Sequence, residues 1–219
     1  MGRSVAPLPA WTRSLVTFVA VGLLLFAPLR GYVLSGPTWA QRPIVYRVNP
    51  TNLDLPTTAI DPAVRAGADV WATQSTASVG FSLAGDSAQT TTGYDGLNLV
   101  VFRNASSGSA IATTYWWSSG SNIIDADVVF WDGAFRFYAG SAGCSGGFYI
   151  EDIAAHEFGH VLGLGHSTLP SATMYPSTAA CDVRNRTLDP DDIAGATALY
   201  PPMSVPTPPT RVRIVPLLH

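Results

Sequence analysis

Three of the four histidines in this 219-residue chain fall within one eleven-residue window. The window covers residues 156–166 and reads His-Glu-Phe-Gly-His-Val-Leu-Gly-Leu-Gly-His. Residues four apart lie on the same face of a helix, so His156 and His160 can direct their imidazole rings at one metal ion. Gly163 lets the chain leave the helix in a conformation that residues with side chains resist, and this turn can bring His166 to the same ion. The window therefore predicts a helix that ends at Gly163, followed by the third ligand of a metal site.

The three imidazoles favour Zn²⁺ as the metal. Three neutral histidines bind Zn²⁺ and leave its fourth coordination position open to water. Glu157 directly follows the first ligand and points to another side of the helix, which suits a general base better than a further ligand. We expect one catalytic Zn²⁺ on His156, His160 and His166, with Glu157 as the catalytic residue. The fourth histidine, His219, is interpreted as an exposed residue of the tail.

Composition excludes two other classes of protein. The 12 basic residues are all arginines and are outnumbered by 15 acidic residues, so the chain lacks the basic footprint of a nucleic-acid-binding protein. A hydrophobic fraction of 47% excludes an acidic disordered chain. We expect one domain with its own core and no nucleic-acid partner.

The first forty residues are similar to a secretory signal peptide. Arg3 and Arg13 precede an apolar run over residues 15–27, which as a helix would reach only about 20 Å, less than the ~30 Å hydrocarbon core of a membrane. Small residues in the triplet Thr38-Trp39-Ala40 predict cleavage before Gln41, with an upstream cut as an alternative. The prediction is a secreted protein that contacts the membrane only transiently. The alternatives are an uncleaved N-terminal membrane anchor with the domain facing outside, and a buried helix.

For the rest of the chain we predict one domain over residues 41–201 and a proline-rich tail over residues 202–219. Asp61-Pro62 and Asp189-Pro190 each combine an N-cap residue with proline at the first helical position, so each predicts the start of a helix. A third helix, the one that carries the histidines, is expected to begin near Ile150. Alternating apolar residues predict five strands, over residues 44–48, 79–83, 97–102, 111–116 and 123–130.

The chain contains two cysteines, Cys144 and Cys181. Their spacing excludes a C-x-x-C redox or zinc pair. Export to an oxidising compartment would allow them to form a disulfide, which would constrain the unfolded chain by roughly 4 kcal/mol in the entropic model. Two unpaired buried thiols are the alternative.

The histidine window resembles the signature of the metzincin metallopeptidases, H-E-x-x-H-x-x-G-x-x-H followed by a methionine-containing turn. Met174, within Ala-Thr-Met-Tyr-Pro at 172–176, is placed to be that methionine. Ser167, the Met-Tyr-Pro triplet and the segment 188–193 narrow the resemblance to the matrixin branch, which the chain resembles from about residue 43 to residue 200. The resemblance implies an α+β fold with a twisted, mixed five-stranded sheet, three main helices and a zinc cleft between upper and lower subdomains.

This resemblance also implies an activity. It predicts a secreted, monomeric zinc endopeptidase that acts on proteins or peptides, with Glu157 activating a metal-bound water. Two alternatives are a catalytically silent, zinc-stabilised binding module and a zinc hydrolase of a non-peptide amide. Neither cysteine precedes the domain, so inhibition by a propeptide cysteine, as in the family, is not expected.

Further likenesses concern two strands beside the metal site. In vertebrate members both strands carry histidine ligands of a second, structural zinc, and the matching residues here are Thr113 and Val129. We therefore expect no second zinc. Asp127 and Asp132 could supply oxygen ligands to Ca²⁺. Trp131, however, stands where the family would have an acidic residue. The alternative is that Asp127 and Asp132 are exposed polar residues at a strand end. The segment that resembles the family's substrate-binding edge strand consists of Ile111, Ala112, Thr113, Thr114 and Tyr115.

Two more expectations concern the walls of the cleft. The family has tyrosine two residues after the proline of the methionine turn, where this chain has Thr178, so the size of the family's pocket cannot be transferred. A disulfide between Cys144 and Cys181 would tie the loop before the zinc helix to the segment after the methionine turn.

Overall fold

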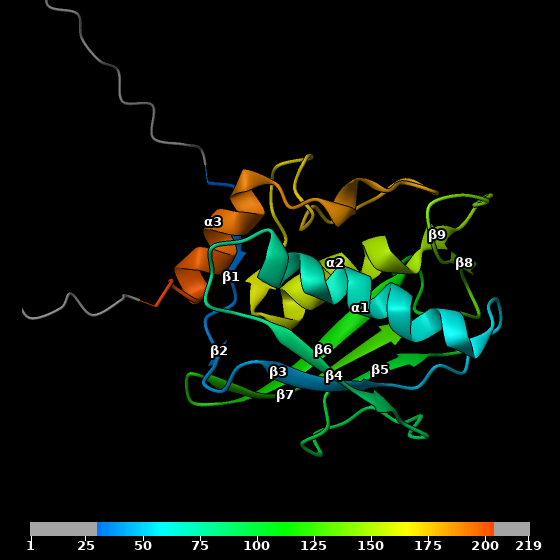
Figure 1. The fold of residues 1–219 in the computed structure, drawn as a ribbon, viewed down its shortest axis with the longest axis horizontal. Helices are drawn as coiled ribbons and strands as arrows, with labels where there is room; N and C mark the ends of the chain where they lie inside the picture. Colours follow the sequence, from blue (N-terminus) through cyan, green and yellow to red (C-terminus); the bar gives the residue numbers. More distant parts are fainter. Residues whose placement is uncertain (1–29, 204–219) are drawn as a thin grey trace, which may run out of the picture.

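The computed structural model describes residues 30–203 (Figure 1). Within this range helices and strands are combined in one α+β fold, as the sequence predicts. The helices are α1 (Thr57–Thr73), α2 (Ile150–Val161) and α3 (Pro190–Leu199), with a short 3₁₀-helix η1 (Arg184–Arg186). The strands are β1 (Val33–Leu34), β2 (Thr38–Trp39), β3 (Ile44–Val48), β4 (Phe81–Asp86), β5 (Leu99–Phe102), β6 (Ala112–Ser119), β7 (Asn122–Phe130), β8 (Phe137–Tyr138), β9 (Phe148–Tyr149) and β10 (Leu164–Gly165).

The main sheet is mixed, with one antiparallel strand at its edge. Its order is β2-β7-β5-β3-β4, all parallel, while β6 pairs antiparallel with β7. Five of these strands correspond to the five predicted ones. The sixth, β2, is only two residues long and pairs with the start of β7. Among the described residues β6 pairs with β7 alone, so its other edge is available for hydrogen bonding.

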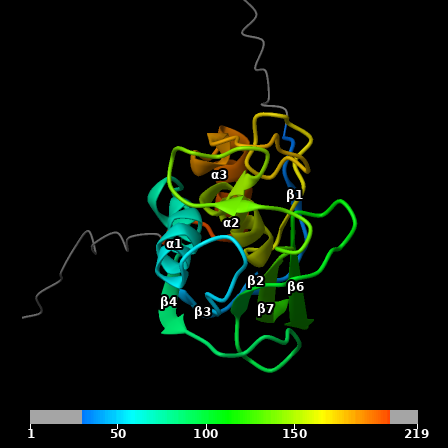
Figure 2. The same cartoon turned by 90° about the vertical axis from the view of Figure 1, so that its right-hand side faces the viewer.

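Helices α1 and α2 lie side by side on one face of the sheet (Figures 1 and 2). Gly67 of α1 permits this close approach, because a methyl group there would lie 2.5 Å from the Cβ atom of Ala154 on α2. The core between the helices and the sheet includes alternate residues of β3, Ile44, Tyr46 and Val48, all 3% exposed or less.

The predicted start of α1 at Asp61-Pro62 is wrong. The helix begins five residues before the predicted first helical residue, at Thr57, and Pro62 lies inside it. Ile60 is fully buried and extends the apolar stripe that Val64 and Trp71 continue, so burial of the stripe favours the longer helix. The Asp-Pro pair at α3 behaves as predicted, since Asp189 caps that helix through the backbone N–H of Asp191.

Residues 31–39, which the sequence assigned to the signal peptide, pack against the domain. Strand β1 pairs with β10, just before the third histidine of the window. The indole Nε1 of Trp39 donates a hydrogen bond to the carbonyl oxygen of Val161 at 2.7 Å. The backbone N–H of Gly31 donates to Asp191 at 2.7 Å. Cleavage at the predicted site, after residue 40, would remove all of these contacts.

The predicted helix of the histidine window is confirmed. Helix α2 ends at Val161, and Gly163 follows with a φ of 97°, a conformation that residues with side chains rarely adopt. The chain then forms β10. In residues 30–203 no helix is both long enough and apolar enough to cross a membrane. The apolar run at 15–27 and most of the proline-rich tail lie outside the described residues.

Candidate metal centre

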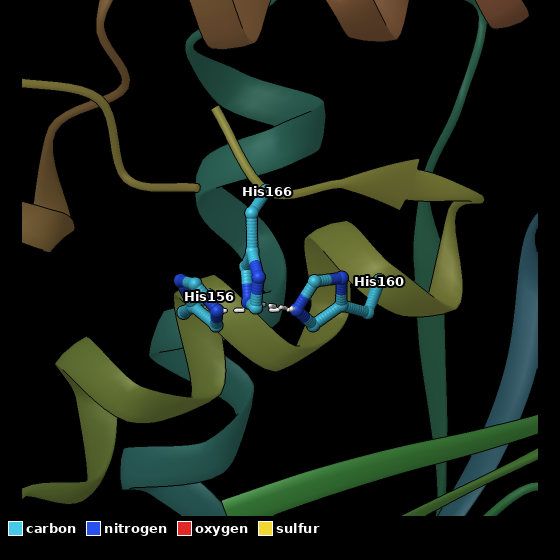
Figure 3. Close-up of side chains that lie close together, drawn as sticks. All are labelled: His156, His160 and His166. Atoms are coloured by element: carbon cyan, nitrogen blue, oxygen red, sulfur yellow. Dashed lines mark hydrogen bonds between the residues drawn. The ribbon is translucent and has the colours of Figure 1, made fainter. Parts of the chain in front are cut away.

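The three histidines of the window converge on one point (Figure 3). The Nε2 atom of His160 lies 3.1 Å from Nε2 of His156 and 3.2 Å from Nε2 of His166. Tetrahedral ligands with Zn–N bonds of 2.0–2.1 Å would be separated by about 3.3 Å, so the observed spacing fits this ion. Among the described residues this is the one group of three or more His, Cys, Asp or Glu side chains close enough to share a metal.

Backbone carbonyls orient two of the rings. Nδ1 of His156 lies 2.7 Å from the carbonyl oxygen of Thr173, and Nδ1 of His160 lies 2.8 Å from that of Leu164. A carbonyl can only accept, so each Nδ1 carries the hydrogen and each Nε2 keeps its lone pair for a metal. The sequence did not predict either partner, because one lies on the methionine turn and the other follows the helix.

Burial keeps these ligands neutral. It lowers the pKa of His156 and of His160 to about 4 in each case, since a charged imidazolium would lose its hydration there. The pKa of His166 is also lowered by burial. Neutral imidazole is the form that binds metal, so at neutral pH the three histidines can bind a cation without first losing a proton.

Glu157 lies in the same cleft as the histidines, with only 5% of the residue exposed. Its Oε2 atom accepts a hydrogen bond of 2.7 Å from the hydroxyl of Thr114 on β6. Burial raises the pKa of this carboxyl, while nearby His160 and the Thr114 hydrogen bond act in the opposite direction. A buried carboxyl with a raised pKa is suited to exchanging protons, which is the chemistry of a general base.

The cleft has a volume of about 470 Å³ and two distinct walls. Strand β6 and the residues just before it form one wall, and the segment after Met174 forms the other. Four of the five predicted edge-strand residues line the cleft, whereas Tyr115 does not and is 39% exposed. The side-chain oxygen of Thr178, in the opposite wall, is buried and has no hydrogen-bond partner among the described residues. The residues that line these two walls include Ile111, Ala112, Thr113, Thr114, Trp116, Tyr175, Pro176, Thr178 and Asn185.

Met174 is buried against helix α2, with 1% of its surface exposed. Its carbonyl oxygen accepts a hydrogen bond from the backbone N–H of Ser167, the residue after the third histidine. The carboxylate of Asp192, at the start of α3, accepts from the backbone N–H groups of Thr173 and Met174. These bonds fix the methionine turn beside the histidines, consistent with a supporting role rather than a ligand role.

The predicted disulfide is present and joins Cys144 to Cys181. The bond contradicts the alternative of two unpaired thiols. It ties the loop before α2 to the segment that forms the second wall of the cleft. A second link is made by Arg186, whose guanidinium donates a 2.6 Å hydrogen bond to Asp152 of α2 and stacks on Tyr149. Both links hold the second wall to the metal-binding helix.

The two positions matched to a second zinc have other contacts here. The Thr113 hydroxyl accepts a hydrogen bond of 2.9 Å from the indole N–H of Trp131. Val129 and Trp131 pack in a small apolar cluster with Leu99 and Val101 on the sheet face opposite the main core. The surroundings of the two positions are therefore apolar side chains and the Thr113 hydroxyl, which already has a hydrogen-bond partner.

The two carboxylates considered as calcium ligands accept hydrogen bonds from the backbone of different segments. Asp127 accepts hydrogen bonds from the backbone N–H groups of Gly93 and Leu99. Asp132 accepts from the backbone N–H of Leu53. Both residues are buried, so the alternative of exposed polar residues is wrong. Calcium binding by this pair stays a prediction.

The fold and the site together define a domain of the metzincin class: a mixed sheet, a helix with two histidines, a glycine turn to the third, and a methionine turn packed beside them. Residues 38–201 match the family model described as Matrixin. The chain belongs to the matrixin family, whose members are zinc-dependent metalloendopeptidases.

Individual relatives agree with this assignment. The chain is 27% identical to rat matrilysin over 176 residues, which is 76% of this chain and 60% of that protein. Human matrilysin matches with the same identity and coverage. Human matrix metalloproteinase-20 is 51% identical over 59 residues, covering 27% of this chain and 12% of that protein. The chain therefore matches at most about three fifths of the length of these relatives.

Proposed function

We propose that this chain is a secreted zinc endopeptidase that hydrolyses peptide bonds in proteins or peptides. The observation that carries the proposal is the convergence of three neutral imidazoles on one point, with the carboxyl of Glu157 in the same cleft. An acid-base group in the same cleft as a metal with an open coordination position is an arrangement that can hydrolyse an amide.

His156, His160 and His166 would hold the metal through their Nε2 atoms. Zn²⁺ bound there would polarise the carbonyl of the scissile bond and lower the pKa of a bound water to about 7. Glu157 takes a proton from the attacking water and then transfers it to the nitrogen of the leaving amine. Burial of Glu157 supports this role, because a raised pKa makes its protonated form accessible between the two steps.

Strand β6 would bind the substrate. One edge of β6 pairs with β7, and among the described residues the other edge pairs with no strand. An extended peptide could add to this edge by backbone hydrogen bonding, next to the histidines that the same cleft contains.

The silent binding module is the main alternative. A purely structural zinc site has no use for Glu157, and burying a carboxyl that does no chemistry carries a desolvation cost. The presence of this group therefore favours turnover. A hydrolase of non-peptide amides would use the same groups, so only a substrate test separates it from the proposed peptidase.

The test compares the Glu157→Gln variant with the wild type on casein, gelatin and a diverse peptide library. Glutamine keeps the shape but cannot accept the proton, so cleavage should fall by more than about a thousandfold while one zinc per chain is retained. Glu151→Gln is the matched control, because Glu151 lies on the same helix outside the cleft. Full activity of Glu157→Gln would overturn the proposal. A zinc-loaded wild type that cleaves no peptide would favour the alternatives.

A further inference from the structure

Thr114, in the wall of the cleft, contacts Glu157 through its hydroxyl. It is the third residue of β6 and lies opposite Val128 of β7. Its hydroxyl lies 2.7 Å from Oε2 of Glu157 and 3.2 Å from the carbonyl oxygen of the same residue. The hydroxyl has one hydrogen to donate, and the shorter distance, to a carboxylate, marks the stronger bond.

Thr114 is the only side chain among the described residues that donates a hydrogen bond to the Glu157 carboxylate. The carboxylate is buried, so bulk water cannot freely supply it with further hydrogen-bond donors. The bond engages Oε2 alone and leaves Oε1 without a protein partner. Oε1 is therefore the oxygen available to a water molecule in the cleft.

The hydroxyl can also fix the orientation of the carboxylate. The last torsion of a glutamate side chain is broad, so without a partner the carboxylate plane can rotate. Threonine is branched at Cβ, which restricts its own side-chain torsion, and β6 is held along its length by β7. A stiff donor on a paired strand thus sets which way the carboxylate faces.

We propose that Thr114 is a positioning residue, which acts through Glu157 by holding its carboxylate in the orientation needed for proton transfer. The inference rests on the proposed peptidase function. Positioning of a general base affects the chemical step more than the binding of substrate. Loss of the Thr114 hydroxyl should therefore lower kcat and leave KM nearly unchanged.

The test uses three substitutions at this position. Thr114→Val keeps the shape and removes the donor, and we expect kcat to fall about 10- to 100-fold with KM changed less than about threefold. Thr114→Ala should behave similarly. Thr114→Ser keeps the donor and should restore kcat to within about threefold of wild type. Thr76→Val is the control, because its hydroxyl contacts Thr197 and lies outside the cleft.

A second readout does not depend on turnover. In crystals of metal-free protein, the Glu157 carboxylate should occupy one orientation in the wild type and in Thr114→Ser, and more than one in Thr114→Val. A single unchanged orientation in Thr114→Val, or a kcat within twofold of wild type at equal zinc content, would overturn the proposal. If the wild type cleaves no peptide, the peptidase function fails, and the crystal comparison alone decides whether Thr114 positions Glu157.

Discussion

Gly159 of helix α2 lies directly against the side chain of Met174. A methyl group added to Gly159 would overlap the Met174 sulfur and approach the Trp71 ring to 2.6 Å. Met174 and Trp71 are both buried, with 1% and 0% of their surfaces exposed. The helix that carries His156 and His160 can therefore sit this close to the methionine turn only because residue 159 has no side chain.

Substitution of Gly159 by alanine should destabilise the domain. Met174 and Trp71 are both buried, so a methyl group at residue 159 would overpack this contact, at a cost of about 1–3 kcal/mol. The expected loss in Tm is roughly 3–10 °C, measured by calorimetry. Gly93→Ala is the control, because a methyl group there meets nothing within 4 Å. Equal Tm values for the two variants would contradict the close packing at residue 159.

The disulfide should contribute strongly to stability. Cys144 and Cys181 are 37 residues apart in sequence, and closing a loop of this size constrains the unfolded chain by about 4 kcal/mol in the entropic model. Replacing both cysteines by serine should lower Tm by about 8–15 °C. A reductant should lower the Tm of the wild type and leave that of the double variant unchanged. A double variant as stable as the wild type would contradict this role.

Zinc affinity should resist mild acid. The pKa of His156 and of His160 in the folded protein is about 4, below the ordinary histidine value of 6.5. Protons therefore compete with the metal at these two ligands only as pH falls towards 4. Between pH 7.5 and 5.5 we expect the zinc dissociation constant to rise less than about tenfold, against about a thousandfold for three histidines with ordinary pKa values. Competition with a chelator at each pH measures the dissociation constant. A rise of about a thousandfold would contradict the effect of burial on the two histidines.

We propose that the N-terminal segment is a signal peptide and that it is removed upstream of the predicted site. Residues 31–39 pair with β7 and β10, and Trp39 and Gly31 form buried hydrogen bonds with the domain. We therefore propose that cleavage leaves these residues in the mature protein. N-terminal sequencing of the exported protein should find a start no later than residue 31. A chain that begins at Gln41 should have a lower Tm, and a natural start at Gln41 would contradict the proposal.

Local patterns explain why the metal-binding helix could be predicted. The ligands His156 and His160 and the glycine that ends the helix are close in sequence, so helical periodicity and backbone freedom determine their relation. Asp189-Pro190 was predictable for the same reason. Asp61-Pro62 has the same capping pattern but lies inside α1, because burial of Ile60 favours a helix that starts before this pair. A capping pattern is therefore informative only when the residues before it are not needed in the core.

The contacts that tune the site could not be predicted from sequence. Thr114 and Glu157 are 43 residues apart, and His156 and Thr173 are 17 apart. No local pattern links such pairs, because the sheet and the methionine turn bring them together only in the folded chain. The short strand β2 was missed for a different reason, since the small residues Thr38 and Ala40, on either side of Trp39, resemble those of a signal-peptide cleavage site.

Titration of the metal-free protein with zinc tests the central claim most directly. We expect peptide cleavage to rise linearly with added zinc and to stop rising at one equivalent per chain. Glu157→Gln should bind the same single equivalent and stay inactive throughout the titration. Cleavage by protein freed of metal, or full cleavage by zinc-loaded Glu157→Gln, would contradict a peptidase site built from three histidines and this glutamate.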